Sequence, residues 1–406
     1  MANRHLLTTI TCIALALGLV YLLIILPFLI FLAPGIYAVL SSYMLVKVFK
    51  RYRPEMDKNP ILELQEIEAK LEEAKRMKIY DLTNKNGMCV KITNVGCAIM
   101  KILIPTEDGH VDVVLGLDTP QEYKENNKPH FGVVCGRVAN RIANGKFMFG
   151  DEEISLELND GKHHLHGGSV GFDKRIWNTL SSTENNVVFS LNSYDGDSRY
   201  PGDLHCKVEY SLTDDNTLRI DYFAETMTKT VCNLTNHSYF NLCGFDAKDI
   251  YSQEMEINSG KITSVDDELI PTGEFEYVDS TPFDFRTPKT IGQDIFEAGE
   301  VNDTGGYDHN YVLRGEGKAA SVYSPNTNIR MNVYTNSPGL QFYSGNFLDG
   351  SASGKGVIYN KHSGFCLETQ FYPNSVNIPS FPSCVVTKEE PQTFYTEFKF
   401  DWKNLT

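Results

Sequence analysis

From residue 79 onward the chain is a succession of short segments in which apolar and polar residues alternate. Runs rich in Gly, Pro, Asn and Asp separate segments such as MCVKITNV, CKVEYSL, TLRIDYFAET and IRMNVYTN. A period of two places successive side chains on opposite faces of a strand, so one face can enter a core. Helical periodicity is nearly absent here. The pattern predicts an all-β fold, a large antiparallel β-sandwich.

The length of 406 residues does not require a second large domain, because all-β domains often exceed two hundred residues. We expect four regions, namely an anchor at 1–53, a helical linker at 54–78, the β-sandwich at 79–402 and a tail at 403–406. No Gly-rich phosphate-binding loop opens a helix, so a nucleotide cofactor has no obvious site.

Charge is distributed unevenly along the chain. The first 53 residues contain five basic and no acidic side chains, whereas the remainder has 32 basic against 52 acidic side chains, a net charge of −20. An acidic surface repels phosphate groups, so nucleic acid is excluded as a partner and a neutral molecule is favoured.

Residues 6–46 form an uncharged run of 41 residues. Because about 20 apolar residues span a bilayer as a helix, this run predicts membrane insertion. We favour one span from Leu6 to about Phe31, ended by Pro34, over a hairpin broken near Pro27. A cleaved signal peptide is a third reading, disfavoured because the apolar stretch is much longer than a signal core.

Three observations predict that this anchored domain faces the cytosol. Basic residues follow the span, which is typical of a cytosolic flank: Lys47, Lys50, Arg51 and Arg53. The nine cysteines show no paired spacing, which indicates free thiols in a reducing compartment. Glycans on the sequons at Asn233 and Asn236 would crowd His237 in a lumenal protein.

Between anchor and sandwich, residues 59–78 have apolar side chains at helical spacing: Ile61, Leu64, Ile67, Leu71, Ala74 and Met77. This pattern predicts an amphipathic helix, with Pro60 in its first turn. Its stripe can pack on the sandwich, lie on the membrane or pair with a second copy, and a docked linker is the favoured reading.

Two residues are candidates for proton transfer. His237 lies in NLTNHSYFNLCG among hydroxyl and amide groups, and histidine titrates nearest neutral pH. Glu368 lies in HSGFCLETQ beside apolar neighbours, where desolvation raises the pKa of a carboxyl and makes it a better base.

Polar residues in other motifs can bind a small polar ligand. Arg141 and Asn140 of GRVANRIANG offer a planar fork of donors and an amide. Asp308 lies in GGYDHN, and Gln341 lies in an aromatic run bracketed by glycines. An arginine paired with a surface acid and an asparagine in a turn are the alternative readings.

The run HHLHGG suggests a metal site at first sight. Adjacent residues in an extended segment point to opposite faces, however, so His163 and His164 cannot converge and we predict no zinc site. Aromatic residues can stack on a ligand, but most are expected to pack in the core: Trp177, Tyr239, Phe240, Phe342 and Tyr343.

Taken in order, these motifs resemble the aldose 1-epimerase (galactose mutarotase) family from about Ile79 to Trp402. The shared motifs are TNKNGM, DVVLG, GRVANRIA, LHGG, GFDK, YPGD, NLTNHSYFNL, PTGE, FDFR, YDHN, QFYSGNFLDG, KHSGFCLETQ and PNSVN.

The resemblance implies a single large β-sandwich with an open cleft that interconverts the α and β anomers of free hexoses such as glucose and galactose, without a cofactor. It implies that Glu368 is the general base and His237 the general acid. The resemblance also implies that His166 lies beside the ring oxygen of the sugar. It implies that Asn140, Arg141 and Asp308 bind sugar hydroxyls and that Gln341 closes the rim of the cleft. We expect a monomer or a weak dimer.

Two other functions stay open at this point. A relative that acts on hexose 6-phosphate would need a basic pocket, which the charge of −20 disfavours. A non-catalytic, membrane-tethered sugar-binding module would be indicated by loss of Glu368 or His237, and both are present.

Overall fold

The computed structural model describes residues 44, 60–107, 109–300 and 304–402. The chain divides into two compact units, Met1–Lys75 and Arg76–Thr406. Apart from Met44, the segment 6–46 that we expect to enter a membrane lies outside the described residues. Within the described ranges no helix is both long and apolar enough to cross a bilayer. Helix α4 (Pro60–Arg76) occupies the stretch for which an amphipathic helix is predicted.

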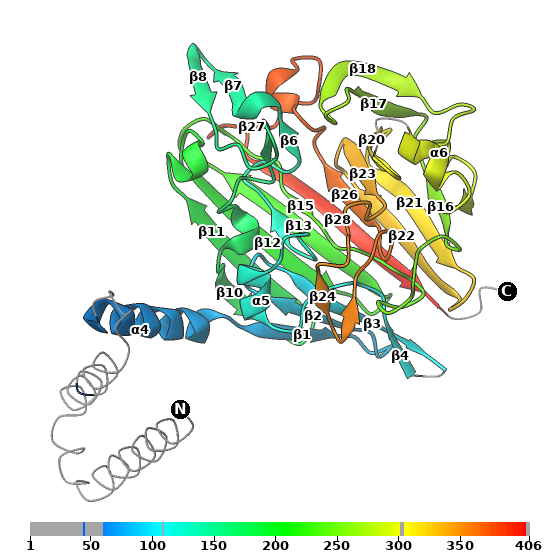
Figure 1. Ribbon diagram of the computed structural model, residues 1–406, viewed down its shortest axis with the longest axis horizontal. Coiled ribbons are helices and arrows are strands. Elements are labelled where there is room, and N and C mark those ends of the chain that lie inside the picture. Colours follow the sequence, from blue (N-terminus) through cyan, green and yellow to red (C-terminus); the bar gives the residue numbers. More distant parts are fainter. Residues whose placement is uncertain (1–43, 45–59, 108, 301–303, 403–406) are drawn as a thin grey trace, which may run out of the picture. The chain divides into compact units, whose positions relative to one another are not determined.

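The second unit is built from antiparallel sheets (Figure 1). The largest sheet has nine strands, in the spatial order β10 (Asn178–Ser182), β11 (Asn186–Ser193), β12 (Leu204–Leu212), β13 (Thr217–Glu225), β28 (Gln392–Asp401), β22 (Ile329–Thr335), β21 (Gly317–Ser324), β16 (Glu254–Ile257) and β19 (Lys289–Thr290).

A second sheet has five strands, in the order β18 (Pro271–Tyr277), β17 (Lys261–Val265), β20 (Asp308–Val312), β23 (Gly339–Tyr343) and β26 (Cys366–Gln370). A third sheet contains β1 (Ile79–Thr83), β2 (Cys89–Thr93), β3 (Ile99–Thr106) and β4 (Gly109–Asp112).

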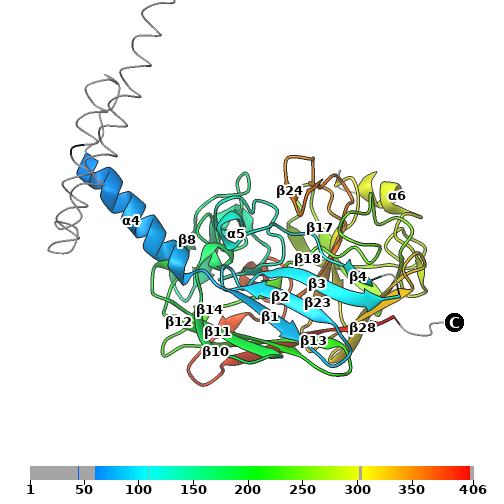
Figure 2. The same cartoon turned by 90° about the horizontal axis from the view of Figure 1, so that it is seen from below.

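Short two-stranded ribbons and helices complete the unit. The ribbons pair β5 (Val134–Cys135) with β15 (Thr235–Asn236), β6 (Arg141–Ile142) with β9 (His164–Leu165), β7 (Lys146–Phe149) with β8 (Glu152–Ser155), β14 (Thr230–Val231) with β27 (Val385–Val386), and β24 (Ser353–Gly354) with β25 (Val357–Ile358). The helices are α5 (Pro120–Glu125), α6 (Ile295–Glu300) and the short 3-10 turns η1 (Ala143–Gly145), η2 (Phe172–Lys174), η3 (Asp197–Arg199) and η5 (Ser375–Asn377). In Figure 2, strands β10, β11 and β13 lie along one side of this unit, and α5, β24 and α6 lie on the opposite side.

The nine-stranded sheet follows the period-two pattern of the sequence. Along β12, β22 and β28 buried residues alternate with partly exposed ones, so one face of each strand enters the core and the other meets solvent. The mostly β, antiparallel fold predicted from the alternation is therefore confirmed for the described part of the second unit.

The five-stranded sheet packs its apolar face into the same core. Leu340, Phe342 and Leu367 are at most 1% exposed and belong to one cluster with Phe398 of β28. Burial of side chains of this size contributes about 1.5–3 kcal/mol each. The Thr369 hydroxyl is also hydrogen-bonded to a hydroxyl on β28, which joins the two sheets.

Strands β23 and β26 depart from the alternating pattern because all five residues of each are buried. One face of these strands packs on the nine-stranded sheet, and the other face is also shielded from water. Polar side chains on that second face, such as Gln341 and Glu368, are therefore held in a desolvated environment.

His309 on β20 provides a test of this packing. Its ring lies 4.3 Å from that of Phe283, its Nε2 has no hydrogen-bond partner in the described part of the chain, and burial lowers its pKa to about 4. Because the folded pKa lies below the ordinary value of 6.5, the stabilisation is complete above pH 6.5 and is lost as pH falls to about 4. The loss amounts to about 3 kcal/mol.

We expect His309→Phe to remove this component of the pH dependence. Urea unfolding at a series of pH values should show a smaller fall in the free energy of unfolding for the variant between pH 6.5 and 4. Between pH 7 and 8 the two proteins should give parallel curves. Parallel curves across the whole range would contradict the neutral, buried state of His309.

Candidate active site

A cavity of about 410 Å³ opens over the second face of the five-stranded sheet. Its lining combines residues of the sheet with residues from loops: Lys128, Pro129, His130, Asn140, Arg141, Leu165, His166, His237, Tyr239, Asp308, Tyr343, Phe347, Leu348, Asp349, Ser351 and Glu368. Six of the seven residues predicted for the site line this cavity, and the seventh, Gln341, contacts one of them.

The sheet supplies Asp308, Gln341 and Glu368 from the adjacent strands β20, β23 and β26. Gln341 is paired with Glu368 across one ladder and with Asn310 across the other, so these residues share one face of the sheet. Asp308 lies two residues before Asn310 and therefore on the same face. Nε2 of Gln341 donates a hydrogen bond to Oδ1 of Asp308 (2.7 Å), which fixes both side chains.

Three loop segments supply the rest of the predicted lining, which we call the loop wall. Asn140 and Arg141 lie at the start of β6, and His166 follows β9, its ladder partner, in which Leu165 is paired with Arg141. His237 directly follows β15 and is anchored by backbone hydrogen bonds to Val133 (2.8 Å) and Gly132 (3.0 Å).

The protonated nitrogen of His166 follows from its hydrogen bonding. The backbone N–H of Asn140 donates to Nδ1 of His166 (3.2 Å), so this nitrogen carries a lone pair. Burial, followed by the nearby His130, lowers the pKa of His166 well below its ordinary value, so the ring is neutral. A neutral ring with an unprotonated Nδ1 has its proton on Nε2, and His166 is a hydrogen-bond donor toward the cavity.

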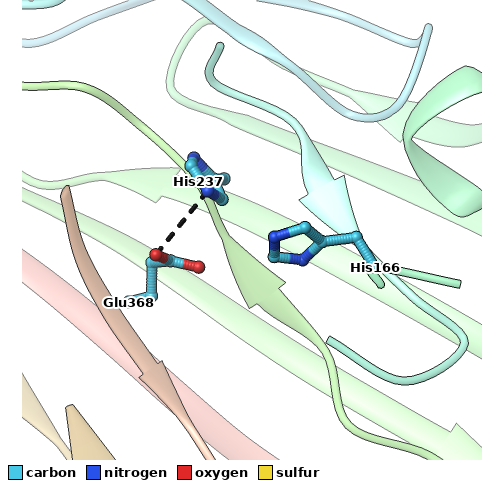
Figure 3. Close-up of side chains that lie close together, drawn as sticks. All are labelled: His166, His237 and Glu368. Carbon is cyan, nitrogen blue, oxygen red and sulfur yellow. Dashed lines mark ion pairs between the residues drawn. The ribbon is translucent and has the colours of Figure 1, made fainter. Parts of the chain in front are cut away.

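His237 and Glu368 form a pair on the cavity floor (Figure 3), with 3.6 Å between Nε2 and Oε1. Burial lowers the pKa of His237 to about 3. Burial and the neighbouring Asp308 raise the pKa of Glu368 well above its ordinary value, an effect that Arg141 opposes. Both shifts disfavour the charged forms, so burial favours a neutral carboxyl and a neutral imidazole that share one proton over a pair of opposite charges.

Arg141 combines the two roles considered from the sequence, an ion pair with an acid and a place in the ligand-binding site. Its Nε donates to Oδ2 of Asp160 (2.8 Å), while the side chain, 13% exposed, lines the cavity. The positive charge also opposes the effect of burial on the pKa of Asp308, which burial raises. The guanidinium is thus held by one acid outside the cavity and faces two acids within it.

His166, His237 and Glu368 also bring three possible metal-binding atoms within 4.8 Å of one another. A metal-bound histidine normally donates its second ring N–H to a carbonyl or carboxylate. Nδ1 of His166 instead faces a backbone N–H, and Nδ1 of His237 lies 3.6 Å from the Cys366 thiol. This donor set fits proton transfer better than metal binding.

The other histidines of HHLHGG do not converge on the cavity. Nδ1 of His163 accepts from the backbone of Asn144 (3.1 Å), whereas His164 contacts the Glu157 carbonyl and the Tyr200 hydroxyl. His166 alone of the three lines the cavity.

Among the lining residues outside the predicted set, three can take part in binding. His130 lines the cavity, and no motif around it signals this position. Tyr239 and Tyr343 also line the cavity, while both are buried members of a core cluster, as expected for aromatic residues. The other aromatics considered, Trp177, Phe240 and Phe342, are fully buried in the core as expected.

Together the fold and the cavity define a β-sandwich with a desolvated acid–base site for a small polar molecule. Comparisons with known proteins agree with this class. The family described as aldose 1-epimerase matches residues 78–399. Galactose mutarotase from Bos taurus is 44% identical over 316 residues, which are 77% of this chain and 90% of that protein.

Aldose 1-epimerase from Escherichia coli (strain K12) is 37% identical over 344 residues, or 83% of this chain and 99% of that protein. A crystal structure of an aldose epimerase homologue from C. elegans has a TM-score of 0.75 at 28% identity and covers 81% of this chain and 100% of its own. The chain belongs to the aldose 1-epimerase family, and the resemblance found in its motifs is confirmed.

Histidine NMR can test the assigned protonation states. We expect the His237 ring to remain neutral from about pH 8 down to pH 5, because its lowered pKa of about 3 lies below that range. The ¹⁵N shifts of His166 should show the proton on Nε2. Spectra of His237→Asn and His166→Asn assign the signals, and a cationic His237 at about pH 6 would contradict the neutral pair.

Proposed function

We propose that this protein is an aldose 1-epimerase that interconverts the α and β anomers of free hexoses, with glucose and galactose as substrates. The observation that carries the proposal is the buried pair of Glu368 and His237, which shares one proton on the floor of a polar cavity. Galactose mutarotases and aldose 1-epimerases are its relatives over most of the chain.

Ring opening of a hexose requires one proton to leave the anomeric hydroxyl and another to reach the ring oxygen. In our proposal the proton of the pair moves from Glu368 to His237 when the hexose binds. The carboxylate of Glu368 then takes the first proton and the imidazolium of His237 gives the second, as the bond between the anomeric carbon and the ring oxygen breaks. Rotation about the bond between the first two carbons exposes the other face of the aldehyde. The reverse transfers then close the ring and restore both groups, so no net proton is consumed.

The environment of the pair has a direct consequence for this cycle. Opening converts carboxylate and imidazolium into carboxylic acid and neutral imidazole, which is the form that burial favours. Desolvation therefore stabilises the state of the enzyme that accompanies the open-chain sugar, the species of high energy in the reaction. The separation of 3.6 Å is longer than a hydrogen bond, and such distances often tighten only when substrate binds.

The remaining predicted residues position the sugar. Arg141, the Asn140 amide and Nε2 of His166 offer donors from one wall, with His166 proposed on the side of the ring oxygen. Asp308 offers carboxyl oxygens from the sheet, and Gln341 holds it at 2.7 Å. Donors from the loops and acceptors from the sheet suit a ligand whose hydroxyls both donate and accept.

The alternatives from the sequence receive less support. A bound phosphate would require a cationic subsite, but the lining has Lys128 and Arg141 against three carboxyl side chains, and Arg141 is already paired with Asp160. A module that only binds sugar would not need a neutralised carboxyl beside an imidazole. Both proton-transfer groups are present and adjacent.

We also propose that residues 6–46 anchor the protein in a membrane and that the epimerase domain faces the cytosol. Besides the sequence features, the burial of the sequons at Asn233 and Asn236 supports this placement. Asn233 and Asn236 are 1% and 3% exposed, and their side-chain amides donate to backbone carbonyls, so neither can carry a glycan in the folded domain.

Substitution of the pair tests the proposed roles. Glu368→Gln should abolish acceleration of mutarotation above the spontaneous rate while sugar binding persists, because the amide keeps the shape and loses the basicity. His237→Asn should lower kcat by about two to four orders of magnitude. Polarimetry of α-glucose and α-galactose measures both effects.

Glu268→Gln makes the same chemical change outside the cavity, at a side chain that is 44% exposed, and should retain the wild-type rate. Full activity of Glu368→Gln at neutral pH would refute the assignment of the base. A wild-type protein that binds hexose without accelerating mutarotation would support the non-catalytic alternative.

Cell fractionation tests the location. The full-length chain should sediment with membranes and resist carbonate extraction, whereas a chain that begins at Met56 should be soluble and equally active. Protease added outside sealed microsomes should digest the domain, and no glycan shift should appear on a gel. A protected, glycosylated domain would contradict the cytosolic orientation and leave the roles of Glu368 and His237 intact.

A further inference from the structure

His130 lies in the loop after α5 and contributes a third imidazole to the cavity. Its ring centroid is 4.9 Å from that of His166 and 5.9 Å from that of His237, and its side chain is 18% exposed. The proton transfers proposed above do not use this ring.

The buried side chain of Asp173 fixes the tautomer of His130. Oδ2 of Asp173, a residue of η2 whose side chain is 2% exposed, lies 3.1 Å from Nδ1 of His130, and Lys174 lies 3.9 Å from the same oxygen. A carboxylate can only accept a hydrogen bond, so Nδ1 of His130 carries the proton. In the neutral ring Nε2 is then an acceptor, and it makes no hydrogen bond within the part of the chain that the structure describes.

His166 presents the complementary tautomer. Its Nδ1 accepts from a backbone N–H and its Nε2 carries the proton, so the two adjacent rings offer one donor and one acceptor. A hydroxyl group is both a donor and an acceptor, and a single hydroxyl can therefore bind both rings. The other polar groups of this wall, the Arg141 guanidinium and the Asn140 amide nitrogen, are donors.

The backbone around His130 is held rigidly. His130 adopts a left-handed conformation with φ of 63°, which is uncommon for residues other than glycine. The Asn127 side chain forms two hydrogen bonds with the backbone of Phe131, the residue after His130: its Oδ1 accepts from the N–H (2.8 Å) and its Nδ2 donates to the carbonyl (3.0 Å). The Tyr239 hydroxyl donates to the Pro129 carbonyl (2.9 Å). Backbone strain that is fixed in this way is concentrated at functional sites.

We propose that His130, oriented by Asp173, is a sugar-binding residue that accepts a hydrogen bond from one hexose hydroxyl while His166 donates to the oxygen of that same hydroxyl. This inference rests on the proposed function and names one contact by which the site would recognise its sugar. The charged and titratable groups around His130 are Asp173 and Lys174 on η2 and the rings of His166 and His237.

The test measures sugar binding in the Glu368→Gln background, so that turnover does not interfere. NMR titrations would compare this protein with its His130→Phe derivative, using D-glucose and its 2-, 3-, 4- and 6-deoxy analogues. We expect His130→Phe to weaken glucose binding about three- to tenfold, the contribution of one neutral hydrogen bond. One deoxy analogue, which lacks the bridged hydroxyl, should bind both proteins equally.

Further variants separate this role from a structural one. His130→Gln keeps an acceptor and should lose less affinity than His130→Phe, and Asp173→Asn should cause a loss with the same dependence on the hydroxyl. His110→Phe, the same change on β4 outside the cavity lining, is the matched control and should bind every sugar normally.

An equal loss for all analogues, or no loss for any, would overturn the proposal. The same holds if Asp173→Asn leaves every affinity unchanged, because the ring would then not depend on its carboxylate. Binding alone is measured, so the result is independent of catalysis. A wild-type enzyme that binds hexoses without accelerating mutarotation would refute the proposed function and leave the His130 contact testable.

Discussion

Burial of β26 on both faces is the constraint on which the site depends. The apolar face, with Leu367, packs into the core, so the opposite face, with Glu368, is sealed by the residues around the cavity. A buried carboxylate is costly, and this cost raises the pKa of Glu368. Burial disfavours the cationic form of His237 as well and lowers its pKa. The acid–base pair is thus a product of how two sheets stack.

The strands of the large sheet could be predicted because one of their faces meets water. In β12 and β28 solvent and core impose alternation, and the sequence shows it directly. In β23 and β26 both faces are buried, so exposure to solvent does not alternate, although the residues of the cavity face and of the core face still differ in kind. Periodicity alone cannot distinguish a cavity floor from a second core face.

The site could be predicted only where residues lie within motifs. His237, Glu368 and the four proposed binding residues stand in motifs that resemble those of the family, and the order of these motifs makes the residues recognisable. His130 lies in none of the motifs and is 43 positions from Asp173 of GFDK, and only the packing of the loop after α5 against η2 brings them together. The tautomers of His130 and His166 depend on single hydrogen bonds, from the Asp173 carboxylate and from the Asn140 backbone, for which a sequence carries no signal.

Three residues of the loop wall, His130, Asn140 and His166, adopt left-handed backbone conformations with φ between 50° and 63°. Each such residue costs about 1–3 kcal/mol unless its surroundings impose the geometry. Here the surroundings do so. The His166 backbone N–H donates to the Asn140 carbonyl, the Asn140 backbone N–H donates to Nδ1 of His166, and the Asn127 side chain forms hydrogen bonds with both backbone groups of Phe131. The folded protein therefore bears this strain before a ligand arrives. A sugar that enters the cavity meets donors and acceptors that are already oriented, so its binding does not carry the entropic cost of ordering the loop wall.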